Sequence, residues 1–409
     1  MAQTAPDPAQ TARKALDDLL AQKYSELFQS FTPELQKQLP AAQLAKIGDS
    51  LKALGAPQIG EPAVRPGSNP VVTIPIQFPS QQVNAMFAVN GSGQIDRMFI
   101  TRAAADIPWQ HPPYAKLDSF HEKPVTVGND EWKLPGTLTL PNGNGPFPGI
   151  VLVHASGPAD RDETIGHTKI FRDLAEGLAS RGVAVLRYEK RTRQYAARVK
   201  DMTDFTVEEE TVEDAVRAAD LLRAQPEVDP KRVYALGHAL GGYVGPRIAE
   251  EDGKLAGLII FAGNVRPLED LLVDQAEYLG TSPARLAEIK ELVARIKKLE
   301  PADEDAPPIL NMQVSYLLDL KGYDPTAKAK GLQIRMLILQ GERDFQVTMK
   351  DFDLWKAALG SRKDVTLKSY PALNHLFIAG EGKSTEEEYL KPGHVAPEVI
   401  EDIAKWVSQ

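Results

Sequence analysis

Three separate stretches of this chain carry residues that could together transfer an acyl group. The first is the run Gly-His-Ala-Leu-Gly-Gly at 237–242, which follows an apolar β-type run and precedes a helical pattern. Glycines two positions to either side of residue 239 suit a tight strand-to-helix turn that displays a nucleophilic side chain. The displayed residue is Ala239, where a serine would be needed. The backbone of a nucleophile turn is therefore present, and a methyl group occupies the place of the nucleophile.

An acid and a histidine follow in the order that such a turn requires. The run at 337–344 predicts a buried strand that ends in a turn carrying Asp344, and His375 follows the next strand along the chain. With a serine at 239, His375 would accept the hydroxyl proton and Asp344 would hold the imidazole in the correct tautomer. Glu342 is the nearest alternative acid, and we rank it second because it lies closer to the strand.

Acyl transfer also needs N–H donors for the oxyanion of the tetrahedral intermediate. One donor is the N–H after the nucleophile, which belongs to Leu240, and the other comes from the loop after an earlier strand. The apolar run at 150–153 leads into His-Ala-Ser-Gly-Pro at 154–158, and we assign the second donor to Ser156. Ser156 does not lie on a Gly-X-X-X-Gly turn, so it is not favoured as the nucleophile.

Two polar runs, at 160–164 and 187–191, follow strands at the same expected edge of the sheet. Their composition mainly predicts a solvated, salt-bridged rim that positions loops. The functional alternative is that Arg161, Tyr188 or His238 contacts a polar group of a substrate.

The positioning elements follow from hydrophobic periodicity. From residue 149 onward, apolar runs alternate with helical patterns, at 149–154, 183–186, 233–236, 258–261, 334–339 and 365–369, before a closing helix at 397–407. This alternation is typical of the α/β class, with a mostly parallel sheet and helices on both faces. At about 264–330, helical patterns follow one another without strands, which predicts a helical cap over the carboxyl edge of the sheet.

The first quarter of the chain has a different organisation. Residues 10–54 show a helical pattern, and short β-type runs with an Asn-Gly turn occupy 58–103. Helices followed by an antiparallel meander predict a small α+β accessory domain at 1–104. Proline-rich sequence follows. We therefore place a linker and an entry strand at 105–128 and the main domain at 129–409.

Composition limits the other functions. The 409 residues have a formal net charge of -9, no cysteine and seven histidines. Scattered basic residues give no footprint for nucleic acid, and no apolar run is long enough for a membrane span. Histidine spacings do not suit a metal site, and no cofactor is expected. The beginning of the chain lacks signal-peptide features and is typical of residues after a cleaved one, so we expect a secreted or periplasmic native protein, with a cytoplasmic location as the alternative.

These motifs resemble the α/β-hydrolase superfamily, and within it the bacterial serine esterases of the dienelactone-hydrolase and prolyl-oligopeptidase-like branch. The residues that carry the likeness are at 154–162, 187–191, 237–242, 341–348 and 374–375. The family has a glycine directly after the histidine that corresponds to His154, and this chain has Ala155 there. The family's nucleophilic serine is Ala239 here. Residues 1–104 are similar to a small α+β domain of unknown function that often precedes such hydrolases.

The resemblance implies a carboxylesterase that acts through an acyl-enzyme on a small ester, with a peptidase or amidase of the same superfamily as the alternative. Two accounts explain Ala239. One is an engineered Ser→Ala variant that traps a ligand, and the other is a natural pseudoenzyme that binds without cleaving. We favour the first because Asp344, His375 and the glycines of the turn are all retained. The sequence leaves the identity of the ester and the oligomeric state open.

Overall fold

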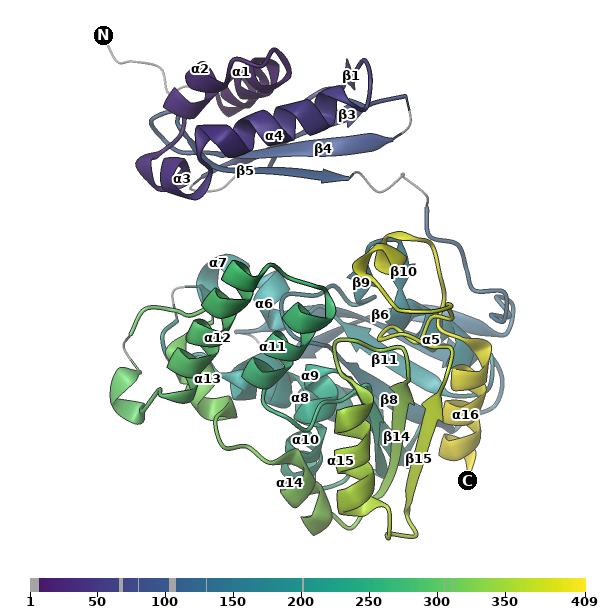
Figure 1. Ribbon diagram of the computed structural model, residues 1–409. Helices are drawn as coiled ribbons and strands as arrows, with labels where there is room; N and C mark the ends of the chain where they lie inside the picture. The colour runs from purple at the N-terminus through teal and green to yellow at the C-terminus, as the bar shows by residue number, and fades with distance from the viewer. Residues whose placement is uncertain are drawn as a thin grey trace. The chain divides into compact units, whose positions relative to one another are not determined.

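The protein consists of two compact units, Met1–Ile107 and Pro108–Gln409. The computed structural model describes residues 7–65, 69–79, 81–102, 108–129, 131–200, 202–304, 306–310 and 312–409 (Figure 1). The sequence placed the end of the accessory domain at 104, three residues before this division, within a stretch that lies outside the described residues.

The N-terminal unit packs helices against one face of an antiparallel sheet (Figure 1). Its helices are α1 (Pro8–Leu20), α2 (Tyr24–Gln29), α3 (Pro33–Gln38) and α4 (Ala41–Lys52). Its strands are β1 (Gln58–Ile59), β2 (Ala63–Arg65), β3 (Val71–Gln77), β4 (Gln82–Val89) and β5 (Ile95–Arg102), in the order β1-β3-β4-β5 with β2 beside β3. Alternate residues of β3 and β4 are buried against the helices, as a half-covered sheet requires.

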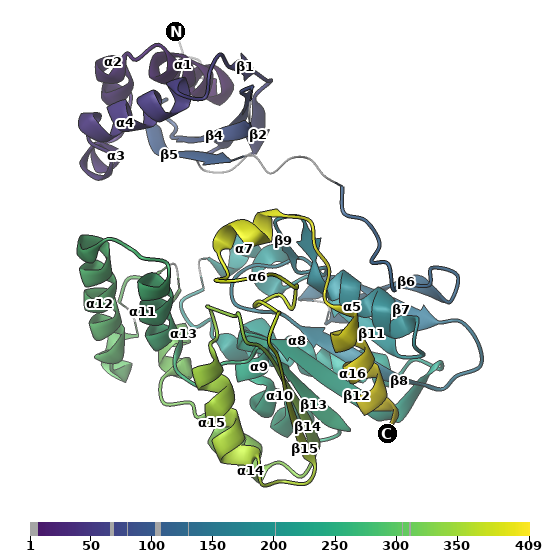
Figure 2. The same ribbon diagram turned by 45° about the vertical axis from the view of Figure 1, so that its right-hand side comes forward.

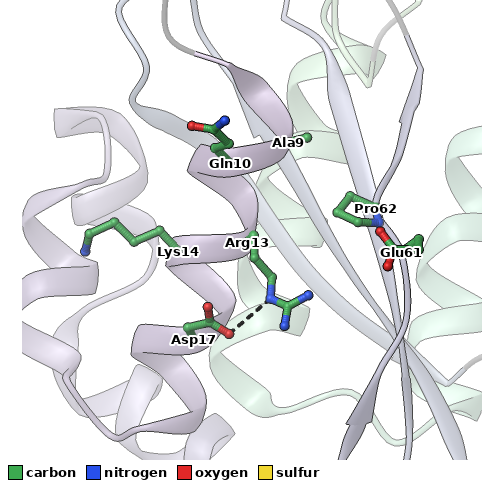
Figure 3. Close-up of a pocket in the computed structure, with 7 residues that line it drawn as sticks. All are labelled: Ala9, Gln10, Arg13, Lys14, Asp17, Glu61 and Pro62. Carbon is green, nitrogen blue, oxygen red and sulfur yellow. Dashed lines mark hydrogen bonds and ion pairs between the residues drawn. The ribbon is translucent and has the colours of Figure 1, made fainter.

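A shallow hollow lies on this unit between α1 and the segment that follows β1 (Figure 3). Its polar wall includes Arg13 and Asp17, whose side chains form an ion pair at 3.2 Å one helical turn apart. Both side chains are well exposed, so the pair is screened by water and contributes little free energy. The hollow brings together charged groups in solvent, and no chemistry is assigned to it.

The second unit is built on an eight-stranded sheet in the order β15-β14-β13-β12-β8-β11-β7-β6. Its strands are β6 (Phe120–Gly128), β7 (Lys133–Pro141), β8 (Phe147–Val153), β11 (Ala184–Tyr188), β12 (Val228–His238), β13 (Gly257–Phe261), β14 (Arg335–Gly341) and β15 (Val365–Tyr370). Neighbouring strands from β11 to β15 are parallel, while β7 is antiparallel to both β6 and β11. The predicted mostly parallel α/β sheet is thus confirmed.

The antiparallel edge shows what the sequence pattern missed. An entry strand was expected before residue 129 and corresponds to β6, but β7 was not predicted. Pro135 and Gly136 interrupt its apolar alternation, so the segment does not have a strong strand pattern. Pro124 is tolerated in β6 because this strand lies at the edge of the sheet, where one side needs no ladder hydrogen bonds.

Helices cover both faces of this sheet (Figure 1). On one face lie α5 (Ile170–Ala179) and α16 (Pro397–Ser408), and on the other lie α8 (Glu213–Arg223), α10 (Gly245–Asp252) and α15 (Met349–Leu359). Strand β12 shows the two-sided packing: Tyr234 and Leu236 contact the first layer, whereas Val233 and Ala235 contact the second. No helix in the described part of the chain is both long and apolar enough to cross a bilayer.

The predicted cap interval contains α11 (Leu268–Tyr278), α12 (Pro283–Lys297), a 3-10 turn η2 (Pro301–Asp303), α13 (Val314–Leu320) and α14 (Pro325–Gly331). Helices α11 and α12 pack side by side (Figure 2). A small apolar cluster that includes Ile296, Leu299 and Leu317 links the end of α12 to α13. Helix α14 instead packs beside α10 and α15, so it belongs to the helical layer of the sheet.

The start of the cap is anchored by a buried carboxylate. Asp351 of α15 is fully buried and accepts the backbone N–H groups of Val265 and Arg266, each at 3.0 Å. Its second oxygen pairs with the Arg266 guanidinium at 2.7 Å. This contact fixes the point at which the chain leaves β13 and enters the cap.

Replacing Asp351 with Asn should therefore lower the free energy of unfolding by about 2 kcal/mol, because Arg266 loses its buried charge partner and keeps only the partly exposed Asp274. All four tryptophans, Trp109, Trp132, Trp355 and Trp406, lie in the second unit, so urea unfolding followed by tryptophan fluorescence reports on that unit. Glu288→Gln in the exposed pair with Arg285 is the control and should change stability by less than about 0.5 kcal/mol. Equal effects of the two changes would contradict the anchoring role.

Candidate active site

The turn after β12 has the strained geometry that displays a side chain. Ala239 has φ 47° and ψ -108°, a region that residues other than glycine rarely adopt. A Cβ on Gly237 would lie 2.1 Å from the carbonyl oxygen of Gly241, and a Cβ on Gly241 would lie 2.4 Å from that of Val153. The turn can therefore close only with glycine at both positions, and it points the Ala239 methyl group into a cavity.

The predicted acid and base meet directly. His375 Nδ1 lies 2.7 Å from Asp344 Oδ2, and both side chains are buried. Asp344 also accepts the N–H groups of Gln346 and Val347 at 2.8 and 2.9 Å, and the amide of Gln340 at 3.0 Å. Donors on several sides fix the orientation of this carboxylate. With Nδ1 donating to Asp344, Nε2 of His375 is the nitrogen left to exchange a proton with a substrate or nucleophile.

The alternative acid lies elsewhere. Glu342 is exposed and accepts a hydrogen bond from the hydroxyl of Ser369 at 2.8 Å. The turn that carries Asp344 lies against the loop that carries His375. This close approach requires glycine at 341, because a Cβ on Gly341 would lie 2.5 Å from the carbonyl oxygens of both Leu373 and Asn374. Within this site Asp344 is the carboxylate in contact with His375.

The loop after β8 approaches the same turn. A Cβ on Gly241 would meet the carbonyl oxygens of Val153 and His154, so the backbone of this loop lies against the start of α9 (Leu240–Tyr243). Ser156 and Leu240, the expected oxyanion donors, both line the cavity that contains the Ala239 methyl group. Burial lowers the pKa of His154 to about 4, so its ring is neutral near pH 7 and accepts or donates without charge.

The two polar runs do not form the solvated rim that the sequence predicted. Glu163, Arg187, Lys190 and Arg191 are all buried. Arg187 pairs with Glu122 and Asp162, and a buried charge persists only when it is paired in this way. Lys190 donates to the carbonyl oxygen of Ala155 at 2.7 Å and lies 3.3 Å from Glu210.

Arg161 and Tyr188, the possible substrate contacts in the two runs, have protein partners in the structure. Arg161 pairs with Glu189 at 2.8 Å, and Tyr188 is buried with its ring 5.4 Å from that of His154. Neither is among the described residues that line the cavity. His238 does line the cavity.

The cavity has a volume of about 960 Å³, at the upper end of the usual range for small-molecule sites. Its cap-side wall is mostly apolar and includes Leu268, Leu271, Leu272, Leu310 and Met312. Glu210, on the π-helical turn η1 (Glu208–Val212), accepts the hydroxyl of Tyr316 of α13 at 2.6 Å. The sequence offered no sign that Glu210 was buried, because it lies in a run of three glutamates.

Comparison with known proteins identifies this arrangement. The family described as serine aminopeptidase, S33, matches residues 164–382. Esterase EstD of Thermotoga maritima is 38% identical over 395 residues, which span 95% of this chain and 92% of that protein. The chain belongs to this family of α/β hydrolases. The predicted resemblance to the α/β-hydrolase superfamily is therefore confirmed, and the match to EstD extends over both units.

Several solved structures are similar to this chain at low sequence identity. An esterase of Pyrococcus furiosus aligns with a TM-score of 0.45 and 14% identity, covering 74% of this chain and 96% of that one. An esterase of Pyrobaculum calidifontis aligns with a TM-score of 0.44 and 16% identity, covering 70% of this chain and 85% of that one.

Among the described residues, no three His, Asp or Glu side chains are arranged to hold a metal ion.

The strain at the turn can be measured. Ala239→Gly should raise the free energy of unfolding by about 1 kcal/mol, because glycine adopts positive φ without strain and the lost methyl group faces a cavity. Ala249→Gly, in the interior of α10, is the matched control and should lower stability by about 1 kcal/mol. Urea unfolding measures the change in the free energy of unfolding for both variants. A loss at both positions would mean that the turn stores no strain at residue 239.

Proposed function

We propose that this site hydrolyses carboxylic esters through an acyl-enzyme when a serine occupies position 239. The observation that carries the proposal is the hydrogen bond between His375 and Asp344 at the foot of a cavity that also contains residue 239 of the strained turn. The 38% identity to a protein named as an esterase supports the choice of an ester.

The proposed reaction follows from proton transfers at His375. Its Nε2 removes the proton of the serine hydroxyl while the oxygen attacks the ester carbonyl, and Asp344 stabilises the resulting imidazolium. The N–H groups of Leu240 and Ser156 stabilise the oxyanion. The imidazolium returns its proton to the departing alcohol, which leaves an acyl group on the serine. Water then attacks this ester with His375 as the base, and the carboxylic acid is released.

With alanine at 239 the chain lacks this nucleophile, and we expect the ester to bind without being cleaved. Removing a triad nucleophile lowers turnover by roughly a millionfold while the pocket and the oxyanion donors remain. The engineered-variant account and the pseudoenzyme account both predict this behaviour. The residue that the source gene encodes at position 239 decides between them.

A peptidase or amidase activity is the second candidate, because the matching family is described as a serine aminopeptidase. The same triad geometry cleaves amides and esters, so the chemistry of the leaving group decides. Comparing kcat/KM for aminoacyl amides and for esters of the same acyl group separates the two activities.

Ala239→Ser should give hydrolysis of p-nitrophenyl esters and covalent labelling by a fluorophosphonate probe. Adding His375→Ala or Asp344→Asn to this variant should lower kcat by at least about a thousandfold, because each removes a member of the triad. Glu342→Gln is the control and should leave kcat unchanged, since Glu342 contacts Ser369. A variant with serine at 239 that neither hydrolyses these substrates nor reacts with the probe would overturn the proposal.

The unaltered Ala239 chain should bind p-nitrophenyl hexanoate and release no nitrophenol. Calorimetric titration measures the binding, and absorbance of the same sample measures the release. Leu271→Asp is expected to weaken binding by at least about tenfold, because it places a charge on the apolar cap wall. Val64→Asp, at an exposed position of the N-terminal unit, is the control and should leave the affinity unchanged. Equal affinities for both variants would contradict the assignment of this cavity.

A further inference from the structure

A buried glutamate lies directly behind the loop that follows β8. Glu163 is almost completely buried, and its Oε1 accepts the N–H of Ala155 at 2.8 Å. Its backbone has φ 48°, which is unfavourable for a residue with a side chain. Its other oxygen, Oε2, has no hydrogen-bond partner among the described residues. A strained backbone and a buried charge both cost free energy, so contacts elsewhere must hold this carboxylate in place.

The second contact is with the residue before position 239. His238 is fully buried, and its Nδ1 lies 3.2 Å from Glu163 Oε1. The contact is close enough for an ion pair, although the N–H is not well aligned with the oxygen. On the other side of the ring, Nε2 lies 3.2 Å from the backbone carbonyl oxygen of His375. Both nitrogens thus face an oxygen, and an imidazolium can donate toward both of them.

The charges around the pair favour this state. Burial opposes a charge on His238, but the attraction of Glu163 and Asp344 together with hydrogen bonding to Glu163 and to the carbonyl oxygen of His375 outweighs it, so the pKa of His238 is raised. Burial would raise the pKa of the Glu163 carboxyl, yet the charge of His238 holds that pKa below its usual value. The other groups that face the pair are His154 beside Glu163, with Lys190 acting on His154 and donating to the carbonyl oxygen of Ala155, and Asp344 and the ring of His375 beside His238.

We propose that Glu163 and His238 form a second carboxylate–imidazolium pair that positions the loops of the active site. The carboxylate holds Ala155, the neighbour of the proposed oxyanion donor Ser156. The imidazolium holds the backbone of His375 and lies next to position 239. One ion pair therefore fixes the oxyanion loop, the nucleophile turn and the histidine loop relative to one another. This positioning role rests on the proposed ester hydrolysis, because it concerns the same site.

The ion pair itself can be tested without any activity. In the Ala239 chain labelled with ¹⁵N-histidine, NMR spectra should show both ring nitrogens of His238 protonated at pH 7, with the signals assigned from a His238→Gln sample. Glu163→Gln keeps an oxygen for the N–H of Ala155 but removes the charge, so His238 should become neutral at pH 7. A neutral His238 ring in the parent chain, or a ring unaffected by Glu163→Gln, would overturn the pair. The spectrum of the parent chain alone shows whether His238 is protonated, even if the Glu163→Gln variant does not fold.

The positioning role is tested with serine at position 239. Adding Glu163→Gln should lower kcat by roughly 10- to 100-fold while KM changes less than about threefold, because misplaced groups affect the transition state more than substrate binding. Asp214→Asn is the matched control: Asp214 is an equally buried carboxylate, but neither it nor its partner Arg191 is among the described residues that line the cavity. Its kcat should stay within about twofold of the parent if the role of Glu163 is specific.

The outcomes separate the two proposals. If Ala239→Ser is inactive while His238 is an imidazolium, ester hydrolysis fails as the function and the ion pair stands. If Ala239→Ser is active and Glu163→Gln lowers kcat no more than Asp214→Asn does, the positioning role fails and the ester hydrolysis stands.

Discussion

The candidate active site depends on how closely two backbones approach at the turn after β12. There is no space for a Cβ at Gly237 or Gly241, because the carbonyl oxygens of Gly241 and Val153 already occupy it. This close approach brings the loop after β8 against the start of α9. The ring of His238 then lies against the carbonyl oxygen of His375, while the next two residues, Ala239 and Leu240, line the cavity. Residue 239 keeps its positive φ with a methyl side chain, so the surroundings and not a serine hydroxyl impose the shape of the turn.

Buried ionisable side chains occur in pairs around this turn. Asp344 lies against His375, Glu163 against His238, and Lys190 against Glu210. Each charge would be costly to bury alone, so the pairs constrain one another's positions. Lys190 also bonds to the carbonyl oxygen of Ala155, and Glu210 accepts the hydroxyl of Tyr316 on the cap. The polar groups beneath the cavity are therefore held in fixed orientations, which is what stabilisation of a developing charge requires.

The sequence predicted those parts of the molecule whose patterns are local. Asp344 and His375 could be found because each follows a strongly apolar strand, and parallel strands place their carboxyl ends at one edge of a sheet. Glu163 and Glu210 could not, because each is surrounded by other charged residues and nothing local distinguishes a buried carboxylate from a solvated one. Burial of these groups is a property of the tertiary fold. The one available signal concerned Glu163, since the run at 160–164 follows a strand that ends at the site. Strand β7 was missed because a proline and a glycine weaken its local strand pattern. Its pairing with β6 and β11 stabilises it, and this pairing is also a property of the tertiary fold.

The edge strand β6 has a consequence beyond the site. A sheet that ends in a long strand with free N–H and C=O groups can pair with the same edge of another molecule. Strand β6 exposes Glu122 and Lys123, and Pro124 removes one backbone donor from it. Charge and a missing donor make this edge a poor template for a further strand. The residues that end the sheet at β6 thus also protect the protein against association by strand pairing.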